Sequence, residues 1–129
     1  MNLPLALAAV AIGGAFGSVL RYLVSIWFLE KVGAGFPWGT FTINVSGAFL
    51  IGVVLELADT WAGFSPYVRL LCATGILGGY TTFSTFAYET YILSAGSFSI
   101  TSVAYAGGSV VAGVIATIGG VALVRVVLH

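Results

Sequence analysis

Charged residues are scarce in this chain. They make up 6% of its 129 residues, whereas hydrophobic residues make up 60%. An average soluble domain carries roughly 25% charged residues, so the composition excludes a soluble globular fold and predicts an integral membrane protein. The formal net charge is zero, which leaves no basic surface of the kind that binds nucleic acid.

Residues that perform catalysis or hold metals are also few. Cys72 is the only cysteine, which excludes an intramolecular disulfide, and the only histidine is the terminal His129. The acidic residues all lie close to the ends of apolar segments: Glu30, Glu56, Asp59 and Glu89. This set offers no nucleophile with a base, no phosphate-binding loop and no metal cluster, so we expect the protein not to be an enzyme.

Hydropathy divides the chain into four apolar segments, at about residues 3–28, 41–57, 67–93 and 100–128. A helix needs roughly 20 apolar residues to cross a bilayer, and each segment is long enough, the second only just. Because the connections are short, we expect one all-α transmembrane domain, residues 1–129, with four spanning helices.

The third segment contains the most unusual stretch of the chain, Gly75-Ile-Leu-Gly-Gly-Tyr-Thr-Thr-Phe-Ser-Thr-Phe86. Its glycines and hydroxyl groups fall at the middle of an otherwise apolar segment. Irregular backbone at that depth is tolerated only where protein or a water-filled cavity satisfies the freed N–H and C=O groups. We therefore predict a third helix broken near mid-membrane, at Gly78-Gly79, with a binding or conduction site at the break.

Neutral polar and aromatic side chains supply the candidate site. Asn44 can donate two hydrogen bonds from within an apolar helix, although membrane asparagines also serve to hold helices together. Phe83 and Phe86 stand at i and i+3, so both rings project from one helix face, where packing or lipid contact is the alternative role. The positive edges of such rings suit a small, strongly hydrated anion, which full charges would bind too tightly to release.

The broken helix also offers ligands of a different kind. Carbonyl oxygens freed at Gly78-Gly79 and the Thr81 hydroxyl are ligands for cations. If two such breaks met at a dimer axis, their oxygens would enclose a sodium-sized ion, and its charge would favour anions nearby.

Basic residues give no preference for one membrane orientation. Arg69 and Arg125 fall on one face, and Lys31 with Arg21 on the other, a balance of two against two. We therefore expect dual topology and an antiparallel homodimer in the lipid bilayer.

Small residues indicate where helices approach each other closely. Gly13 with Gly17 and Gly75 with Gly79 are pairs of this kind. The last segment repeats small residues at every fourth position, which predicts one packing face: Ala104, Gly108, Ala112, Ala116 and Gly120.

Three motifs together resemble the Fluc (CrcB) family of fluoride channels. They are Gly17-Ser-Val-Leu-Arg-Tyr22, Trp38-Gly-Thr-Phe-Thr-Ile-Asn-Val-Ser-Gly47 and the stretch Gly75 to Phe86. The resemblance implies passive export of fluoride down its electrochemical gradient, which lowers cytoplasmic fluoride, across a bacterial inner membrane. It further implies a dual-topology homodimer with two pores and a central structural sodium ion.

The resemblance also implies roles for individual residues. By motif position, Asn44, Phe83 and Phe86 line the pores, and Gly78 with Thr81 holds sodium. Arg21 matches an arginine at the pore entrance, a position that an interfacial snorkelling arginine also explains. Glu89 resembles a family acid near the pore end, and its role stays open. Further polar neighbours are expected along the pore: Ser84, Thr85, Tyr105 and Ser109.

Two other classes of function compete with a channel. A small dual-topology multidrug transporter has the same size and number of spans, but it requires a membrane-embedded glutamate in its first span, where this chain has Arg21 and no acid before Glu30. A membrane assembly subunit would account for the small-residue faces and would use Asn44 to join helices. It gives no reason for a helix broken at mid-membrane.

Overall fold

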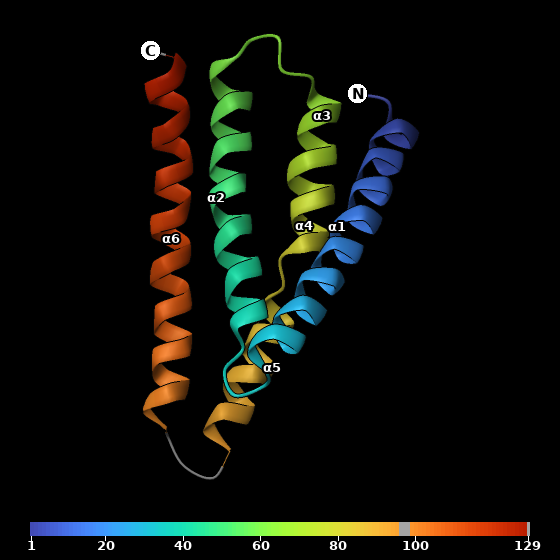
Figure 1. Cartoon of the computed structure of the whole chain (residues 1–129). Helices are drawn as coiled ribbons and strands as arrows, with labels where there is room; N and C mark the ends of the chain where they lie inside the picture. Colours follow the sequence, from blue (N-terminus) through green and yellow to red (C-terminus); the bar gives the residue numbers. More distant parts are fainter. Residues whose placement is uncertain (96–98, 129) are drawn as a thin grey trace.

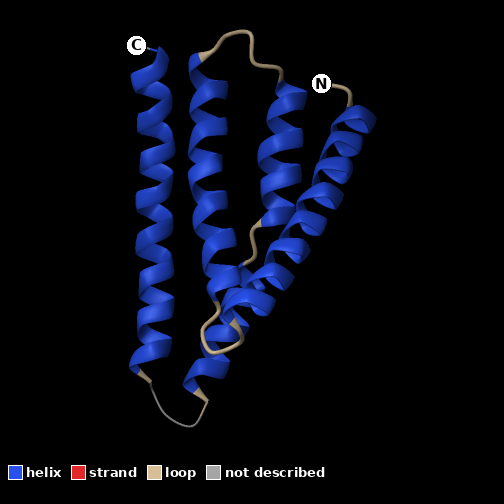
Figure 2. Cartoon of the chain, in the orientation of Figure 1, coloured by secondary structure: helices blue, strands red, loops and turns tan. Residues whose placement is uncertain are grey.

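Every regular element in residues 1–95 and 99–128, the part that the computed structural model describes, is helical (Figure 2). The terminal His129 and part of the connection before residue 100 lie outside the described residues. Helices α1 (Leu3–Val32), α2 (Trp38–Thr60) and α6 (Ile100–Leu128) are long and apolar enough to cross a membrane. Helix α6 has the same bounds as the last predicted span, whereas α1 runs four residues further than predicted and α2 extends three residues beyond each predicted end.

Local chemistry explains where α1 begins and ends. The Asn2 side chain accepts a hydrogen bond from the backbone N–H of Leu5 at 3.3 Å, and Pro4 stands in the first turn, where its missing N–H costs nothing. Gly33 ends the helix with a φ of 84°, a left-handed conformation that favours glycine.

The segment predicted as the third span is not one helix. It comprises α3 (Pro66–Arg69), the π-helix η1 (Leu70–Leu77), α4 (Gly78–Tyr80) and α5 (Phe83–Ser94), which follow one another down the molecule in Figure 1. The predicted break exists, but its predicted position is wrong. Gly78 is helical, with φ −64° and ψ −36°, whereas Thr81 and Thr82 are extended, with ψ of 159° and 116°.

The glycines before the break serve helix packing instead. A Cβ on Gly75 would lie 2.9 Å from the Cα of Gly13, and a Cβ on Gly79 would clash with the backbone of Gly14. Gly17 is equally close to the backbone of the facing helix. The prediction of close packing at these glycine pairs is therefore confirmed. The helical conformation at Gly79 lets the backbone of α4 lie directly against α1, where no side chain would fit.

The predicted small-residue face of α6 is only partly used within the chain. Gly120 is buried against the backbone of Phe49 on α2, whereas Ala104 and Gly108 are exposed. Four residues turn a helix by about 400°, so each step of the repeat drifts about 40° around the axis. Five such positions therefore cannot all face one neighbour.

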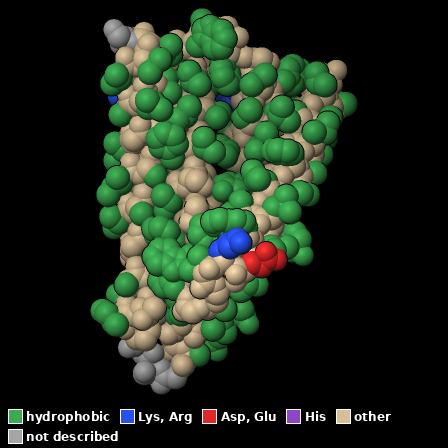
Figure 3. All heavy atoms as spheres, in the orientation of Figure 1, with side chains coloured by type: hydrophobic (Ala, Val, Ile, Leu, Met, Phe, Trp, Pro, Cys, Tyr) green, Lys and Arg blue, Asp and Glu red, His purple; other side chains and the backbone are tan. Residues whose placement is uncertain are grey.

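The helices form an open bundle with a small core. Helix α2 packs mainly on α6, and α1 packs on η1 and α4. The start of α1, the end of α6 and the connection between α2 and α3 lie at one end, and the connection between α1 and α2 lies towards the other (Figure 1). Hydrophobic side chains cover most of the face seen in Figure 3, as expected where lipid or another protein replaces water.

The close contact of α1 with η1 and α4 gives a direct test of this fold. A Cβ at Gly17 would overlap the carbonyl oxygen of Ile76 and lie 2.8 Å from the nitrogen of Tyr80, whereas a Cβ at Gly14 would meet nothing within 4 Å. Gly17→Ala should therefore lower the stability by about 1–3 kcal/mol, measured by thermal unfolding in detergent. Gly14→Ala is the matched control and should be unchanged or slightly more stable. Equal melting temperatures for the two variants would contradict the packing.

Candidate functional site

The site begins at the break between α4 and α5, which one side chain bridges. Asn44 lies on α2, and its Oδ1 accepts a hydrogen bond from the Thr82 N–H at 2.8 Å. Its Nδ2 donates to the Thr82 carbonyl at 3.0 Å. The amide thus pairs with the backbone of the extended residue much as a neighbouring strand would, which satisfies polar groups that the break exposes.

The same hydrogen bonds change the end of α4. In a continuing α-helix, the Thr82 N–H would bond to the carbonyl of Gly78. Because that N–H donates to Asn44 instead, the Gly78 carbonyl loses its helical partner. The Thr81 hydroxyl donates to the Leu77 carbonyl at 2.9 Å and keeps its oxygen lone pairs available.

Helix α2 holds the residues on both sides of the break. Ser46 donates to the carbonyl of Thr42 at 2.6 Å, so the Tyr80 hydroxyl, 3.0 Å away, donates to Ser46. Gly47 makes room for the Thr81 methyl group, which a Cβ at that position would strike. Asn44, Gly78 and Thr81 together line a cavity of about 270 Å³ between α2, η1 and the break. The residues predicted from two separate motifs are therefore brought together.

The start of α5 is capped by its own hydroxyl groups. Thr82 is the N-cap, and its Oγ1 accepts from the Thr85 N–H at 3.2 Å. The Thr82 hydroxyl also donates to Thr85 Oγ1 at 3.0 Å. Thr82 is not among the predicted site residues, although a threonine directly before the first residue of a helix is a favoured N-cap.

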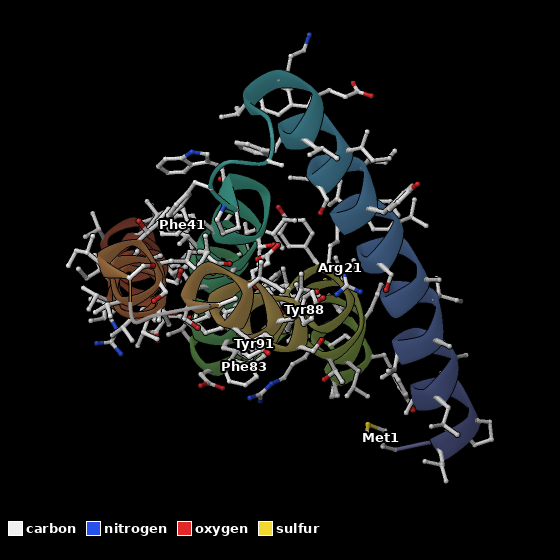
Figure 4. All side chains as sticks on the ribbon, turned by 90° about the horizontal axis from the view of Figure 1, so that it is seen from below. Met1, Arg21, Phe41, Phe83, Tyr88 and Tyr91 are labelled. Atoms are coloured by element: carbon white, nitrogen blue, oxygen red, sulfur yellow. The ribbon has the colours of Figure 1, made fainter. Side chains whose placement is uncertain are left out.

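Beyond the cap, aromatic side chains connect α5 to α6. The Phe83 and Phe86 ring centroids are 5.7 Å apart, and Phe86 lies 5.3 Å from Tyr105 on α6. Tyr105 is 1% exposed, whereas Phe83 is 79% exposed. Figure 4, seen from below, shows Phe83 and Tyr91 on the outer side of α5. The structure therefore joins Phe86 to Tyr105 and leaves Phe83 at the surface of this single chain.

Glu89 lies at the far end of this aromatic row and receives two hydrogen bonds. The Thr40 hydroxyl donates to Oε1 at 2.8 Å, and the Tyr105 hydroxyl donates to Oε2 at 2.7 Å. Thr40 did not stand out in the sequence, because a threonine near the start of a helix is ordinary.

Three further predicted residues lie apart from Glu89 and the aromatic row. The Ser109 hydroxyl is the one buried side-chain polar atom in the described residues that lacks a hydrogen-bond partner. Arg21 projects from α1 into the space between α1 and the other helices (Figure 4), and it joins neither of the ion pairs found in the described part of the chain. Ser84 is 3.4 Å from the Thr82 hydroxyl and is otherwise exposed.

Comparison with known proteins now decides the family. The model of the CrcB-like protein, Camphor Resistance (CrcB) family matches residues 8–121. The chain belongs to the CrcB-like family. With its three long apolar helices, this CrcB-like protein is a multi-pass integral membrane protein.

Curated CrcB-like relatives cover nearly the whole chain. One from Rhizobium meliloti is 46% identical over 116 residues, 90% of this chain and 93% of the relative. One from Leptospira interrogans is 42% identical over 125 residues, 97% of this chain and 98% of the relative. One from Acidobacterium capsulatum is 48% identical over 107 residues, 83% and 86% of the two chains. Each of these relatives is named "Fluoride-specific ion channel FluC".

The bridge from Asn44 to Thr82 can be tested by removing it. Asn44→Leu keeps the approximate volume and loses both hydrogen bonds, so the stability should fall by about 1–3 kcal/mol. The amides of residues 82–86 should also exchange with deuterium faster than in the unaltered protein. Thr90→Val is the control, because the Thr90 hydroxyl bonds only to the Phe86 carbonyl of its own helix. Unchanged exchange around the break in Asn44→Leu would show that Asn44 does not hold it.

Proposed function

We propose that this chain is a fluoride-specific ion channel that exports fluoride passively and so lowers its cytoplasmic concentration. The observation that carries the proposal is the family: relatives named as fluoride-specific channels share 42–48% identity with this chain over most of their length. The neutral character of the site supports it, since hydroxyl, amide and aromatic groups interact with an anion without trapping it. The relatives are bacterial, and we place this protein in a bacterial inner membrane.

The proposed path follows the contacts between α5 and α6. The rings of Phe83, Phe86 and Tyr105 form a row whose edges would attract an anion, and the unpartnered Ser109 hydroxyl is free to donate to one, whereas the Tyr105 hydroxyl already donates to Glu89. Arg21 would draw anions to the entrance. Where a cell is negative inside, the potential drives the anion outward with about 2.3 kcal/mol per charge at 100 mV.

The two alternative functions, a drug transporter and an assembly subunit, have less support than a channel. A proton-coupled drug transporter needs an acid within its first span, but the acid of α1 is Glu30, which lies exposed near the helix end. An assembly subunit gives no reason for the buried, unpartnered Ser109 hydroxyl, which lies four residues after Tyr105 on α6.

We further propose that the working unit is an antiparallel homodimer of chains inserted in both orientations, each with a fourth crossing made by α3 to α5. Arg69 and Arg125 stand at the end opposite Lys31, so the basic residues favour neither orientation. The exposed Phe83 is a further support, since a second chain would give its ring a partner. A tag at the C-terminus should be reached by antibody from both sides of the membrane; access from one side alone would refute dual topology.

A sodium ion at the dimer axis is the last part of the proposal. The Gly78 carbonyl, freed by the break, and the Thr81 oxygen border the same cavity of about 270 Å³. Oxygen atoms of neutral groups suit a hard cation, and a bound sodium ion would add one fixed positive charge near the anion path.

The pore assignment is tested by shortening the aromatic row. Phe83→Ile and Phe86→Ile should each slow fluoride efflux from liposomes by about tenfold or more, because the loss of a ring edge that lowers the barrier by about 1.4 kcal/mol suffices for that factor. Tyr91→Ile is the control, since Tyr91 is a similarly exposed aromatic residue further along α5. Unchanged flux in both phenylalanine variants would refute the pore assignment, provided that the dimer is intact.

The sodium site is tested by replacing the Thr81 hydroxyl with a methyl group. Thr81→Val keeps the methyl group against Gly47 and removes the hydroxyl oxygen, so sodium should bind more weakly in a calorimetric titration of the purified protein. Thr74→Val is the control, because Thr74 is an exposed residue of η1 that does not border the cavity. Equal sodium affinity in the two variants would exclude Thr81 as a ligand.

A further inference from the structure

The row of aromatic rings between α5 and α6 does not end at Tyr105. The centroid of the Tyr105 ring lies 5.3 Å from that of Phe86 on α5 and 5.4 Å from that of Phe36. Phe36 belongs to the connection between α1 and α2, residues 33–37. Its ring plane stands at 83° to that of Tyr105, the edge-to-face arrangement that aromatic pairs prefer. A loop residue therefore packs against a residue of the proposed fluoride path.

The connection between α1 and α2 is short and fixed at both ends, which keeps Phe36 in place. Gly33 ends α1 with a φ of 84°, and the Pro37 carbonyl accepts a hydrogen bond from the Phe41 N–H at 3.0 Å as α2 begins. The Phe36 carbonyl accepts a hydrogen bond from the Trp38 N–H at 2.8 Å, and the two rings pack with their centroids 4.5 Å apart. The Phe36 ring is therefore held against Tyr105 by its own loop.

Phe36 also separates Tyr105 from open space. A second cavity, of about 420 Å³, is bordered by Phe36 together with Thr40, Thr85 and Glu89. Because the Tyr105 hydroxyl donates to Glu89 at 2.7 Å, this cavity lies at the Glu89 end of the aromatic row and continues the proposed path. Tyr105 is now 1% exposed. Without the Phe36 ring, its side chain would be free to turn towards the cavity and to release Glu89.

We propose that Phe36 is a positioning residue of the ion path. Its edge-to-face contact keeps the Tyr105 ring in the aromatic row and the Tyr105 hydroxyl on Glu89. The inference rests on the proposed function, since Tyr105 belongs to a fluoride path only if the chain conducts fluoride. It gives the connection between α1 and α2 a part in conduction, although that connection lies outside α5 and α6.

The first test is fluoride efflux from liposomes that contain Phe36 variants. Phe36→Leu should slow efflux about threefold or more, because the edge-to-face pair is lost and Tyr105 is no longer held. Phe36→Tyr keeps the ring and should restore the rate of the unaltered protein. Phe64→Leu is the matched control, because Phe64 is also a half-buried loop residue packed on a tryptophan, 6.2 Å from Trp61, and does not border the cavity. It should leave the rate unchanged.

A double variant separates positioning from a general loss of stability. In protein that carries Tyr105→Leu, the addition of Phe36→Leu should slow efflux no further, because Phe36 acts through Tyr105. Two effects that multiply independently would overturn the proposal, and so would a full efflux rate in Phe36→Leu alone.

Nitration of tyrosine gives a readout that does not require conduction. Peroxynitrite should nitrate Tyr105 faster in Phe36→Leu than in the unaltered protein or in Phe64→Leu, measured by mass spectrometry of the peptide that contains Tyr105. If the unaltered protein releases no fluoride, the proposed function fails. Equal nitration of Tyr105 in Phe36→Leu and in the unaltered protein would instead overturn the positioning role itself.

Discussion

The hydrogen-bonded pair of Asn44 and Thr82 is the constraint on which the rest of this structure depends. An extended residue between two helices of an apolar segment leaves backbone N–H and C=O groups without hydrogen bonds, which is costly where water is excluded. Asn44 meets that cost with one side chain, through contacts of 2.8 and 3.0 Å to the two polar atoms of Thr82. The break is therefore held by a partner on another helix.

The position of α5 in the bundle follows from the pairing of Asn44 with Thr82. Because α5 restarts after Thr82, it lies against α6, which brings Phe86 to Tyr105 and Glu89 to both Tyr105 and Thr40. The polar groups of the site come from α2, α5 and α6, while α1 contributes a glycine-lined surface that holds η1 and α4 in place. In this arrangement α1 is mainly a support, and its Arg21 projects towards the other helices (Figure 4).

Parts of the fold could be predicted from the sequence where a single local pattern determines the structure. Long apolar runs predict α1, α2 and α6. The glycine pairs predict close helix packing in the first and third segments, and the structure shows that these two segments pack on each other. The position of the break could not be predicted, because Gly78-Gly79 and Thr81-Thr82 are both compatible with it, and the choice depends on tertiary contacts of Asn44 and Gly14. The prediction of one packing face along α6 was only partly right, because a four-residue spacing drifts around the helix axis.

The candidate site was likewise predicted only in part. Asn44, Phe86 and Tyr105 were predicted as site residues, and the structure pairs Asn44 with Thr82 and Phe86 with Tyr105. The contact of Thr40 with Glu89 joins residues 49 positions apart, which no local pattern reveals. The second cavity depends on a similar meeting of distant segments, with the loop after α1 placed beside α5. Spacing within one helix could be interpreted from the sequence, whereas contacts between helices required the fold.

The most direct test of the central claim is ion release from liposomes that contain the purified protein, with the membrane potential collapsed by a potassium ionophore and with fluoride and chloride followed by selective electrodes. We predict rapid release of fluoride with little release of chloride. Release of neither anion, or equal release of both, would contradict a fluoride-specific channel.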